Sequence, residues 1–215
     1  MTEVAVLGSG AWGTTLALVL AHKGVRVRLW EHVPARALVM QRDRANDTFL
    51  PGVALPANVA VTSDIAAAVA AAEVVFFVVP SQRMRANAGR AAPFIAPTAS
   101  VVSASKGLEV GTRARMTQVL RDELPPGPRD RLAALSGPNL AREVAEGKPA
   151  ASVVASADAD TAQQVQALLT TQRLRVYSTD DVVGVELGGT LKNVIAIAIG
   201  LSLIHISEPT RQAEI

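Results

Sequence analysis

The sequence contains no cysteine and only 3 histidines among its 215 residues. Without cysteine the chain has no disulfide framework, no thiolate nucleophile and no cysteine-ligated zinc, and a few scattered histidines make a poor set of metal ligands. We therefore expect no metal site, and we take the cytoplasm as the default location.

Excess charge of one sign and long apolar runs are also missing. Lys and Arg number 21 against 19 Asp and Glu, a formal net charge of +2, and the basic residues are scattered, so we expect no nucleic-acid partner. The most apolar stretch, Val194 to Ile206, is interrupted by Gly200 and His205 and falls short of the ~20 apolar residues of a membrane span. The first residues carry Glu3 and no basic region, so we predict no secretory signal.

What the chain does have is a folded composition, because 49% of its residues are hydrophobic, which excludes disorder. Its length fits one large α/β domain or one domain plus part of another. Short β-branched runs alternate with alanine-rich helical windows, as is typical of βαβ units and a mostly parallel sheet. We predict strands at Val4 to Leu7, Val25 to Trp30, Val59 to Thr62, Val74 to Val79, Val101 to Ser103, Leu132 to Leu135, Ala151 to Ala155 and Leu174 to Tyr177. We predict helices at Thr14 to His22, Pro34 to Arg44, Asp64 to Ala72, Arg83 to Ala91, Arg113 to Glu123, Leu140 to Glu146 and Ala159 to Leu169, with Ser63 and Asp158 among the N-caps.

A glycine-rich segment, Gly8 to Gly13, directly follows the first predicted strand and opens the first helix. In this segment, called the glycine loop below, Gly8 permits the tight turn, Gly10 lets the backbone approach a pyrophosphate, and Gly13 lets helix and strand pack closely. The N-terminus of the helix offers N–H groups to the anion. Because strand, loop, helix and second strand follow in the right order, we predict dinucleotide binding, with a purely structural glycine turn as the alternative.

The second predicted strand ends at Glu31 and His32, near the spacing at which an acid recognises the ribose of a dinucleotide. Glu31 favours NAD by bonding the 2′-hydroxyl, whereas His32 or Arg36 suits the 2′-phosphate of NADP. A solvated glutamate at a strand end is the plain alternative. The choice between NAD and NADP therefore stays open.

Three later loops follow strand ends, where the ligand crevice of a doubly wound sheet lies. Pro80 and Ser81 are candidates to line a cofactor channel. Lys106, one of four lysines in the chain, suits a phosphate or a carbonyl group, although an exposed loop lysine is the alternative. The loop from Ser136 to Ala141 again leads from a strand end to a helix N-terminus, although Asn139 also suits an ordinary helix cap.

Lys192 follows the paired glycines Gly188 and Gly189 at the start of a strongly apolar helix. Adjacent glycines allow the backbone to approach a ligand or a sheet closely. On a buried helix an ammonium group has to face a polar cavity or carry a desolvation penalty. Such a lysine suits the donation of a proton to a carbonyl oxygen as hydride reaches the carbonyl carbon.

Taken in order, these motifs resemble the bacterial-type NAD(P)-dependent glycerol-3-phosphate dehydrogenase family from about Val4 to Gly200. The ordered set carries the resemblance. It comprises Gly8 to Gly13 with Trp12, Leu29 to His32, Asn46 with Phe49 to Gly52, Val78 to Ser81, Ser105 to Glu109, Ser136 to Asn139 and Gly184 to Asn193. The resemblance implies a Rossmann-like doubly wound sheet and the reversible reduction of dihydroxyacetone phosphate to sn-glycerol 3-phosphate, the entry to glycerophospholipid synthesis, with NAD or NADP as cofactor.

Position by position, the resemblance also implies site residues. Beside the three glycines of the glycine loop, the cofactor contacts are Ala11, Trp12, His32 and Ala141, and Lys106 is shared by cofactor and substrate. Gly137 and Asn139 correspond to a substrate loop, and Lys192 to a substrate contact that acts as proton donor and acceptor. Two positions depart mildly from the family: Ala11 stands where serine is common, and Asn139 where serine or threonine is common.

A larger departure follows Gly200. There the family continues into a helical substrate domain with an aspartate and a Ser-Arg-Asn phosphate-binding motif, and this sequence has neither. Leu201 to Arg211 instead resembles the in-frame translation of a common transposase-type sequencing adapter, with a genuine divergent C-terminus as the alternative. We therefore expect a nucleotide-binding domain at 1–184, the first helix of a truncated all-helical domain at 185–200, and a non-native tail at 201–215.

The leading hypothesis is a glycerol-3-phosphate dehydrogenase that takes a small phosphorylated substrate, of which the chain as given is an inactive fragment. The alternative is a nucleotide-binding fragment of a related hydroxy-acid or sugar-phosphate dehydrogenase. A homodimer is considered for the full-length protein, and the sequence indicates neither a nucleic-acid partner nor a membrane span.

Overall fold

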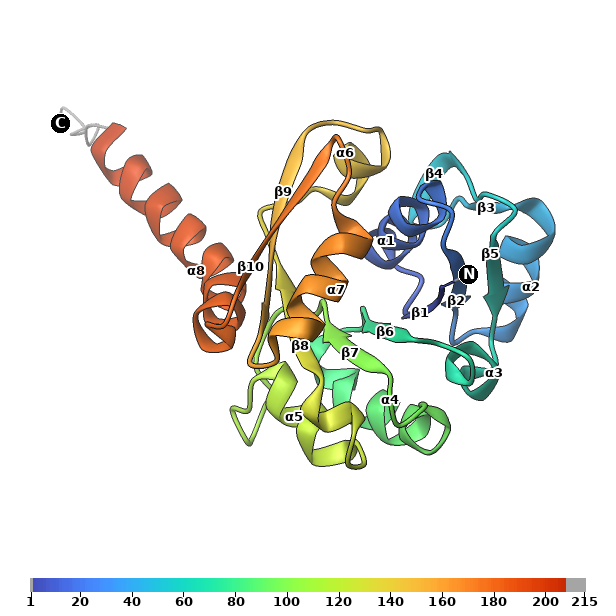
Figure 1. Cartoon of the computed structure of the whole chain (residues 1–215). Coiled ribbons are helices and arrows are strands. Elements are labelled where there is room, and N and C mark those ends of the chain that lie inside the picture. Colours follow the sequence, from blue (N-terminus) through green and yellow to red (C-terminus); the bar gives the residue numbers. More distant parts are fainter. Residues whose placement is uncertain (1, 208–215) are drawn as a thin grey trace, which may run out of the picture.

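The computed structural model describes residues 2–207, which are built around one eight-stranded sheet (Figure 1). The strand order is β10-β9-β8-β7-β6-β1-β2-β5, and every neighbouring pair is parallel except β8 with β9. The strands are β1 Glu3–Leu7, β2 Arg26–Trp30, β5 Val59–Thr62, β6 Val74–Phe77, β7 Ser100–Ser103, β8 Leu132–Ser136, β9 Ala150–Ser156 and β10 Leu174–Thr179. This sheet confirms the Rossmann-like, mostly parallel fold.

Helices cover both faces of the sheet, since alternate residues of a strand point to opposite sides. In β1, Val4 and Val6 belong to one buried apolar cluster, to which helices α1, α2, α6 and α7 contribute. Ala5 and Leu7 belong to a second cluster on the other face, shared with α3, α4 and α5. These helices are α1 Ala11–His22, α2 Pro34–Asp43, α3 Ile65–Val69, α4 Met84–Ala91, α5 Met116–Glu123, α6 Ala141–Ala145 and α7 Ala159–Leu169. A strand buried on both faces explains the unbroken apolar run of β1.

The chain switches direction across the sheet at β1. This strand pairs with β2 on one side and with β6 on the other, so the connections that follow β1 and β6 lead away from each other. Ligands of open α/β sheets bind at such a switch point, outside the carboxyl ends of the strands.

Beyond β8 the strand direction reverses. Ser136, at the carboxyl end of β8, lies opposite Val153 of β9, and β10 runs parallel to β9. The last helix, α8 Val182–Ser207, therefore starts beside the amino end of β8, where Val182 shares a cavity with Leu132. It then runs toward the carboxyl end of β8, where Gly189 packs against Ser136.

The far part of α8 extends away from the sheet (Figure 1). Val194, Ile195, Ile197 and Ile199 are all more than half exposed there. No single helix in residues 2–207 is both long and apolar enough to cross a membrane, although the bent combination of Val182–Lys192 with Val194–Ser202 meets that test by length and composition. The expected domain boundary between residues 184 and 185 falls inside α8, and residues 208–215 of the expected non-native tail lie outside the described residues.

The structure confirms a counterpart for each predicted strand and helix, and it corrects one predicted cap. Asp158 does cap α7, since its carboxylate accepts a hydrogen bond from the Thr161 N–H group. Ser63 does not cap α3. The cap is Asp64, because its carboxylate reaches the N–H groups of the first turn.

The sequence does not predict the small antiparallel pair formed by β3 Ala45–Asn46 and β4 Leu50–Ala54. Pro51 and Gly52 lie inside β4, and both residue types are depleted in strands. The pair is held in place through a side chain instead: Asn46 Nδ2 donates to Ser9 O and to Thr14 Oγ1, each at 2.7 Å.

Candidate functional site

The three glycines of the glycine loop meet three different environments. Gly8 has φ +119°, and a Cβ atom there would lie 2.3 Å from Val78 O. A Cβ atom on Gly13 would lie 1.9 Å from Gly8 O, whereas one on Gly10 would meet nothing within 4 Å. The fold therefore requires glycine at the first and last positions, while Gly10 leaves open space for a ligand to approach the backbone.

The N-terminus of α1 is arranged to receive an anion. Gly10 is the N-cap residue and supplies no side-chain acceptor, so the first N–H groups of the helix are not satisfied by a capping side chain. The loop itself is fixed by Ser9 O, which accepts hydrogen bonds from Asn46 and from Thr14 Oγ1. The sequence points to Asn46 only as part of a family motif, because a contact between residues so far apart in the chain leaves no local pattern.

A cavity of about 450 Å³ lies next to the glycine loop, at the carboxyl ends of β6, β7 and β8. Six of the site residues expected from sequence line it together: Gly10, Trp12, Lys106, Gly137, Asn139 and Ala141. Pro80 and Ser81 line it as well. A larger cavity of about 630 Å³ lies at the opposite edge of the sheet, beside Ser100 at the start of β7, and holds none of the expected site residues.

Lys106 is held at the wall of this cavity. Its Nζ donates a hydrogen bond of 2.9 Å to Gly137 O, and the preceding residue is tied to the end of β6 through Ser105 Oγ, which donates to Val79 O at 2.5 Å. Burial, and to a smaller extent the positive charge of Lys192, lower the pKa of the Lys106 ammonium. A second cation near Lys106 makes this edge of the sheet attractive to an anion.

Lys192 lines a neighbouring cavity of about 240 Å³, whose wall includes Ser136, Gly137 and Gly189. Ser136 and Gly137 belong to both cavities, so the two lysines stand on either side of the same loop. Lys192 itself is exposed, and so are residues 194–202 of the helix that carries it. The close approach expected of the paired glycines occurs at Gly189, where a Cβ atom would lie 2.5 Å from Ser136 Oγ.

Asn139 does not cap α6, which was the alternative role expected from the sequence. Helix α6 begins after Leu140, which makes no side-chain cap. The Asn139 amide instead donates a hydrogen bond of 2.6 Å to Ser152 Oγ on β9. This bond joins the loop after β8 to the reversed part of the sheet and keeps the loop against the cavity.

The end of β2 is organised around Glu31, whose side chain is only 1% exposed. One carboxylate oxygen accepts from Ser9 Oγ, and the other accepts from Val33 N at 2.8 Å and from Arg36 Nη2 at 2.7 Å. Burial raises the pKa of the Glu31 carboxyl, but the hydrogen bonds from Arg36, Ser9 and Val33 outweigh it and hold the pKa below its ordinary value. Glu31 is therefore an ionised anchor of the glycine loop.

His32 is the more accessible group at this strand end. Its side chain is 66% exposed, and its Nδ1 lies 3.1 Å from Glu31 Oε1. Arg36 packs over the ring of Phe49 at 5.3 Å from the ring centre. The side chain at this strand end that is most accessible to a ribose or its phosphate is therefore His32, and not Glu31, the acid that the sequence pattern favours for NAD.

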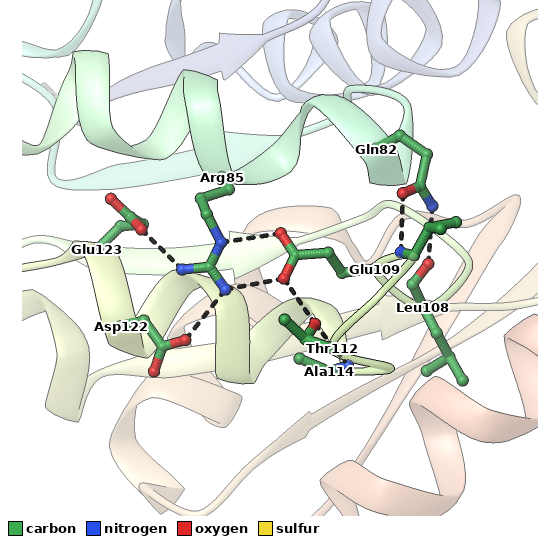
Figure 2. Close-up of polar contacts among 9 residues, drawn as sticks. Gln82, Arg85, Leu108, Glu109, Thr112, Ala114, Asp122 and Glu123 are labelled. Carbon is green, nitrogen blue, oxygen red and sulfur yellow. Dashed lines mark hydrogen bonds and ion pairs between the residues drawn. The ribbon is translucent and has the colours of Figure 1, made fainter.

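The loop that carries Lys106 is clamped from α4 and α5, as Figure 2 shows. Arg85 donates to both carboxylate oxygens of Glu109, at 2.8 and 2.9 Å, and also pairs with Asp122 and Glu123. The Gln82 side chain also holds the loop backbone: its amide nitrogen donates to Leu108 O, and its amide oxygen accepts from Val110 N. Hydrogen bonds from Arg85 and Thr112 lower the pKa of Glu109 to about 2. Sequence reasoning missed this cluster, since its members come from three separate segments.

The sequence matches the family of a known enzyme along most of its length. The N-terminal model of the NAD-dependent glycerol-3-phosphate dehydrogenase family matches residues 3–162, and the C-terminal model of that family matches residues 181–209. A glycerol-3-phosphate dehydrogenase (NAD(P)+) from Geobacter metallireducens is 48% identical over 200 residues, which cover 93% of this chain and 60% of that protein. The one from Streptomyces griseus is 46% identical and is covered to 59%.

Solved structures agree with this result. The crystal structure of a glycerol-3-phosphate dehydrogenase from Coxiella burnetii superposes with a TM-score of 0.86 at 37% identity, and the match covers 94% of this chain and 61% of that one. The chain thus spans about 60% of the length of the curated relatives it matches.

Proposed function

Because the chain belongs to the NAD-dependent glycerol-3-phosphate dehydrogenase family, we propose that the whole protein reversibly reduces dihydroxyacetone phosphate to sn-glycerol 3-phosphate. The product feeds glycerophospholipid synthesis. One observation carries the proposal: the glycine loop, Lys106 and the loop after β8 line one cavity, and Lys192 stands at the adjoining one.

Each group has a task in this proposal. The glycine loop and the N-terminus of α1 hold the pyrophosphate of NAD or NADP, with Trp12, His32 and Ala141 as further contacts, and the bound cofactor supplies hydride. Lys106 orients the substrate, helped by its bond to the Gly137 carbonyl. Gly137 and Asn139 shape the substrate side of the cavity. Lys192 donates the proton that the carbonyl oxygen takes up, and it accepts that proton in the reverse reaction.

The proposed cofactor is either NAD or NADP, in line with the name NAD(P)+ that the relatives carry. The acid that favours NAD in many dinucleotide sites is Glu31, and its oxygens are occupied by Ser9, Val33 and Arg36. His32 and Arg36 supply positive or polar groups beside it. This arrangement supports acceptance of a 2′-phosphate as well as a 2′-hydroxyl.

Turnover by the full-length enzyme tests the assignment. It should oxidise NADH or NADPH only when dihydroxyacetone phosphate is supplied, and Lys192→Ala should lower kcat by about 10² to 10⁴ while nucleotide binding by calorimetry stays as in the parent. Lys23→Ala, far from the cavity, serves as the matched lysine control. A Lys192→Ala enzyme with parental kcat would show that the proton comes from another group.

Assays with a panel of hydroxy acids and sugar phosphates distinguish a glycerol-3-phosphate dehydrogenase from a related dehydrogenase, because a related enzyme would turn over another substrate of the panel.

We further propose that the whole protein is a homodimer, which sedimentation of the full-length enzyme tests. We also propose a cytoplasmic location.

A further inference from the structure

The carboxylate of Glu186, near the start of α8, is buried against another helix, with only 7% of the side chain exposed. It lies at the N-terminus of α5. Glu186 Oε1 accepts from Thr117 N at 2.8 Å, and Oε2 accepts from Thr117 Oγ1 at 2.6 Å and from Arg115 Nη1 at 2.5 Å. Since α5 has no acidic residue in its own first turn, Glu186 supplies from a distance the negative charge and the acceptor that a helix N-terminus favours.

The next turn of α8 carries this contact to the Lys106 loop. Thr190 Oγ1 donates to Glu186 O at 2.8 Å and accepts from Gly107 N at 3.2 Å. Within residues 182–192, two side chains form hydrogen bonds to residues outside α8, those of Glu186 and Thr190. The polar attachment of α8 to the sheet domain therefore converges on one carboxylate and the hydroxyl one turn later.

Packing leaves little freedom at this point. Gly189, between Glu186 and Lys192, sits where a Cβ atom would lie 2.5 Å from Ser136 Oγ and 3.7 Å from Lys106 Cγ. Lys192 follows Gly189 by three residues and so lies on a neighbouring part of the same helix face. A small shift of α8 at Glu186 would consequently change the separation of Lys192 from Lys106.

We propose that Glu186 is a positioning residue: by capping α5 from α8, it sets the place of Lys192 relative to Lys106 across the Ser136–Gly137 loop. Glu186 touches neither cavity, so it acts through the two lysines. What the lysines do rests on the proposed function, but their relative placement does not.

The chain offers a direct measurement, since it contains only four lysines, at positions 23, 106, 148 and 192. Reductive methylation with ¹³C-formaldehyde labels each of them for NMR titration, and lysine-to-arginine variants assign the signals. In the parent, the pKa of Lys106 is lowered by burial and by Lys192. Glu186→Gln keeps the side-chain size but removes the charge and one acceptor, so α8 should shift and the pKa of Lys106 should rise toward its ordinary value.

The sign of the change identifies its cause. Loss of a nearby negative charge alone lowers the pKa of a lysine further, whereas departure of Lys192 raises it. Glu73→Gln, at an exposed position just before β6, is the matched control and should leave the pKa of Lys106 unchanged. Thr117→Val, which removes one donor but no charge, should also raise the pKa, by a smaller amount. A Lys106 pKa in folded Glu186→Gln equal to or below that of the parent overturns the proposal. If Glu186→Gln does not fold, an unshifted Lys106 in Thr117→Val overturns it.

Kinetics of the full-length enzyme provide the second readout. Glu186→Gln should lower kcat by roughly 10- to 100-fold through misplacement of the reacting groups, with the KM for the cofactor unchanged and Glu73→Gln equal to the parent. If the dehydrogenase assignment fails, the parent itself shows no turnover, and the lysine titration still decides the role of Glu186. If the parent turns over and Glu186→Gln matches its kcat, the positioning role is wrong.

Discussion

Single residues in the glycine loop separate what the fold needs from what a ligand needs. Gly8 combines a positive φ with backbone contact to Val78 O, so any side chain there meets both strain and a clash. Gly10 meets neither. Glycine is therefore needed at position 8 for the stability of the fold, whereas at position 10 it leaves room for a ligand to approach the backbone.

A matched pair of alanine variants tests this division. Gly8→Ala should destabilise the chain, by about 1–3 kcal/mol from backbone strain alone, as measured by urea unfolding. Gly10→Ala should unfold like the parent but bind NADH roughly tenfold more weakly or worse, a loss of about 1.4 kcal/mol or more, as measured by calorimetry. Equal NADH affinities for Gly10→Ala and the parent would show that the pyrophosphate does not approach this residue.

The sequence predicts the glycines and Lys106 as candidate site residues because they follow strand ends, which local pattern reveals. Lys192 is expected at the start of a helix, but the structure places it well inside α8, which already begins at Val182. The sequence leaves Glu31 undecided between ribose binding and a plain strand end. The deciding contact is the bond from Ser9 Oγ, 22 residues earlier in the chain. Such a contact depends on how two strands pair, which no local periodicity expresses.

At the scale of elements, the loop after β7 is fixed by its neighbours. Glu109 is bonded to Arg85 of α4, and the same guanidinium reaches Asp122 and Glu123 of α5 (Figure 2). A cation shared by three carboxylates ties two helices and the loop into one unit. Because Lys106 lies three residues before Glu109 in the same loop, these ion pairs also fix the position of Lys106.

The pH dependence of unfolding should report this cluster. The pKa of Glu109 is about 2 in the folded chain, below its ordinary value of 4.5, so its ionisation favours the folded state above pH 4.5, and the contribution is lost as pH falls toward 2. Glu109→Gln should unfold more easily near neutral pH and lose less stability on acidification over that range. Thermal unfolding between pH 2 and pH 7 measures it, with Glu73→Gln as the control. An acid limb for Glu109→Gln parallel to that of the parent would place the relevant titration elsewhere.

The sequence predicts the helices and the strands of the large sheet more completely than it predicts the contacts of single residues. The sequence predicts eight strands because the apolar runs of strands buried on both faces of a sheet are nearly unbroken, short as they are. The sequence does not predict the β3–β4 pair, because β3 has only 2 residues and β4 carries Pro51 and Gly52. The position of this pair depends on the Asn46 side chain rather than on a hydrophobic pattern.

For the whole molecule, the chain holds a cavity lined by Gly10, Trp12 and Lys106 but spans about 60% of the length of its curated relatives. The apolar side chains of Val194, Ile195, Ile197, Ile199 and Leu201 on α8 are exposed, and exposed apolar surface of this kind promotes association. We propose that residues 201–215 are non-native, although the C-terminal family model matches as far as residue 209. Sequencing of the source locus across codon 200 tests this, and a continuous native frame would refute it.

The 215-residue chain should bind nucleotide without turnover. Its described cavities contain Lys106 and Lys192, but catalysis needs the substrate held on all sides in one geometry. Calorimetric titration with NADH and NADPH, followed by an assay with dihydroxyacetone phosphate, makes the measurement, and Gly10→Ala provides the binding-deficient control. Measurable turnover by this chain would show that the remaining substrate contacts are dispensable.

The contact of the glycine loop with Val78 also sets an order in time. Gly8 and Gly13 both pack on that residue, and β1 has its place only between β2 and β6. A chain leaves the ribosome amino end first, so the glycine loop is made well before Val78 emerges. We therefore expect nascent protein that ends before β6 to carry the glycine loop without its folded shape, and to bind nucleotide only after β6 has joined the sheet.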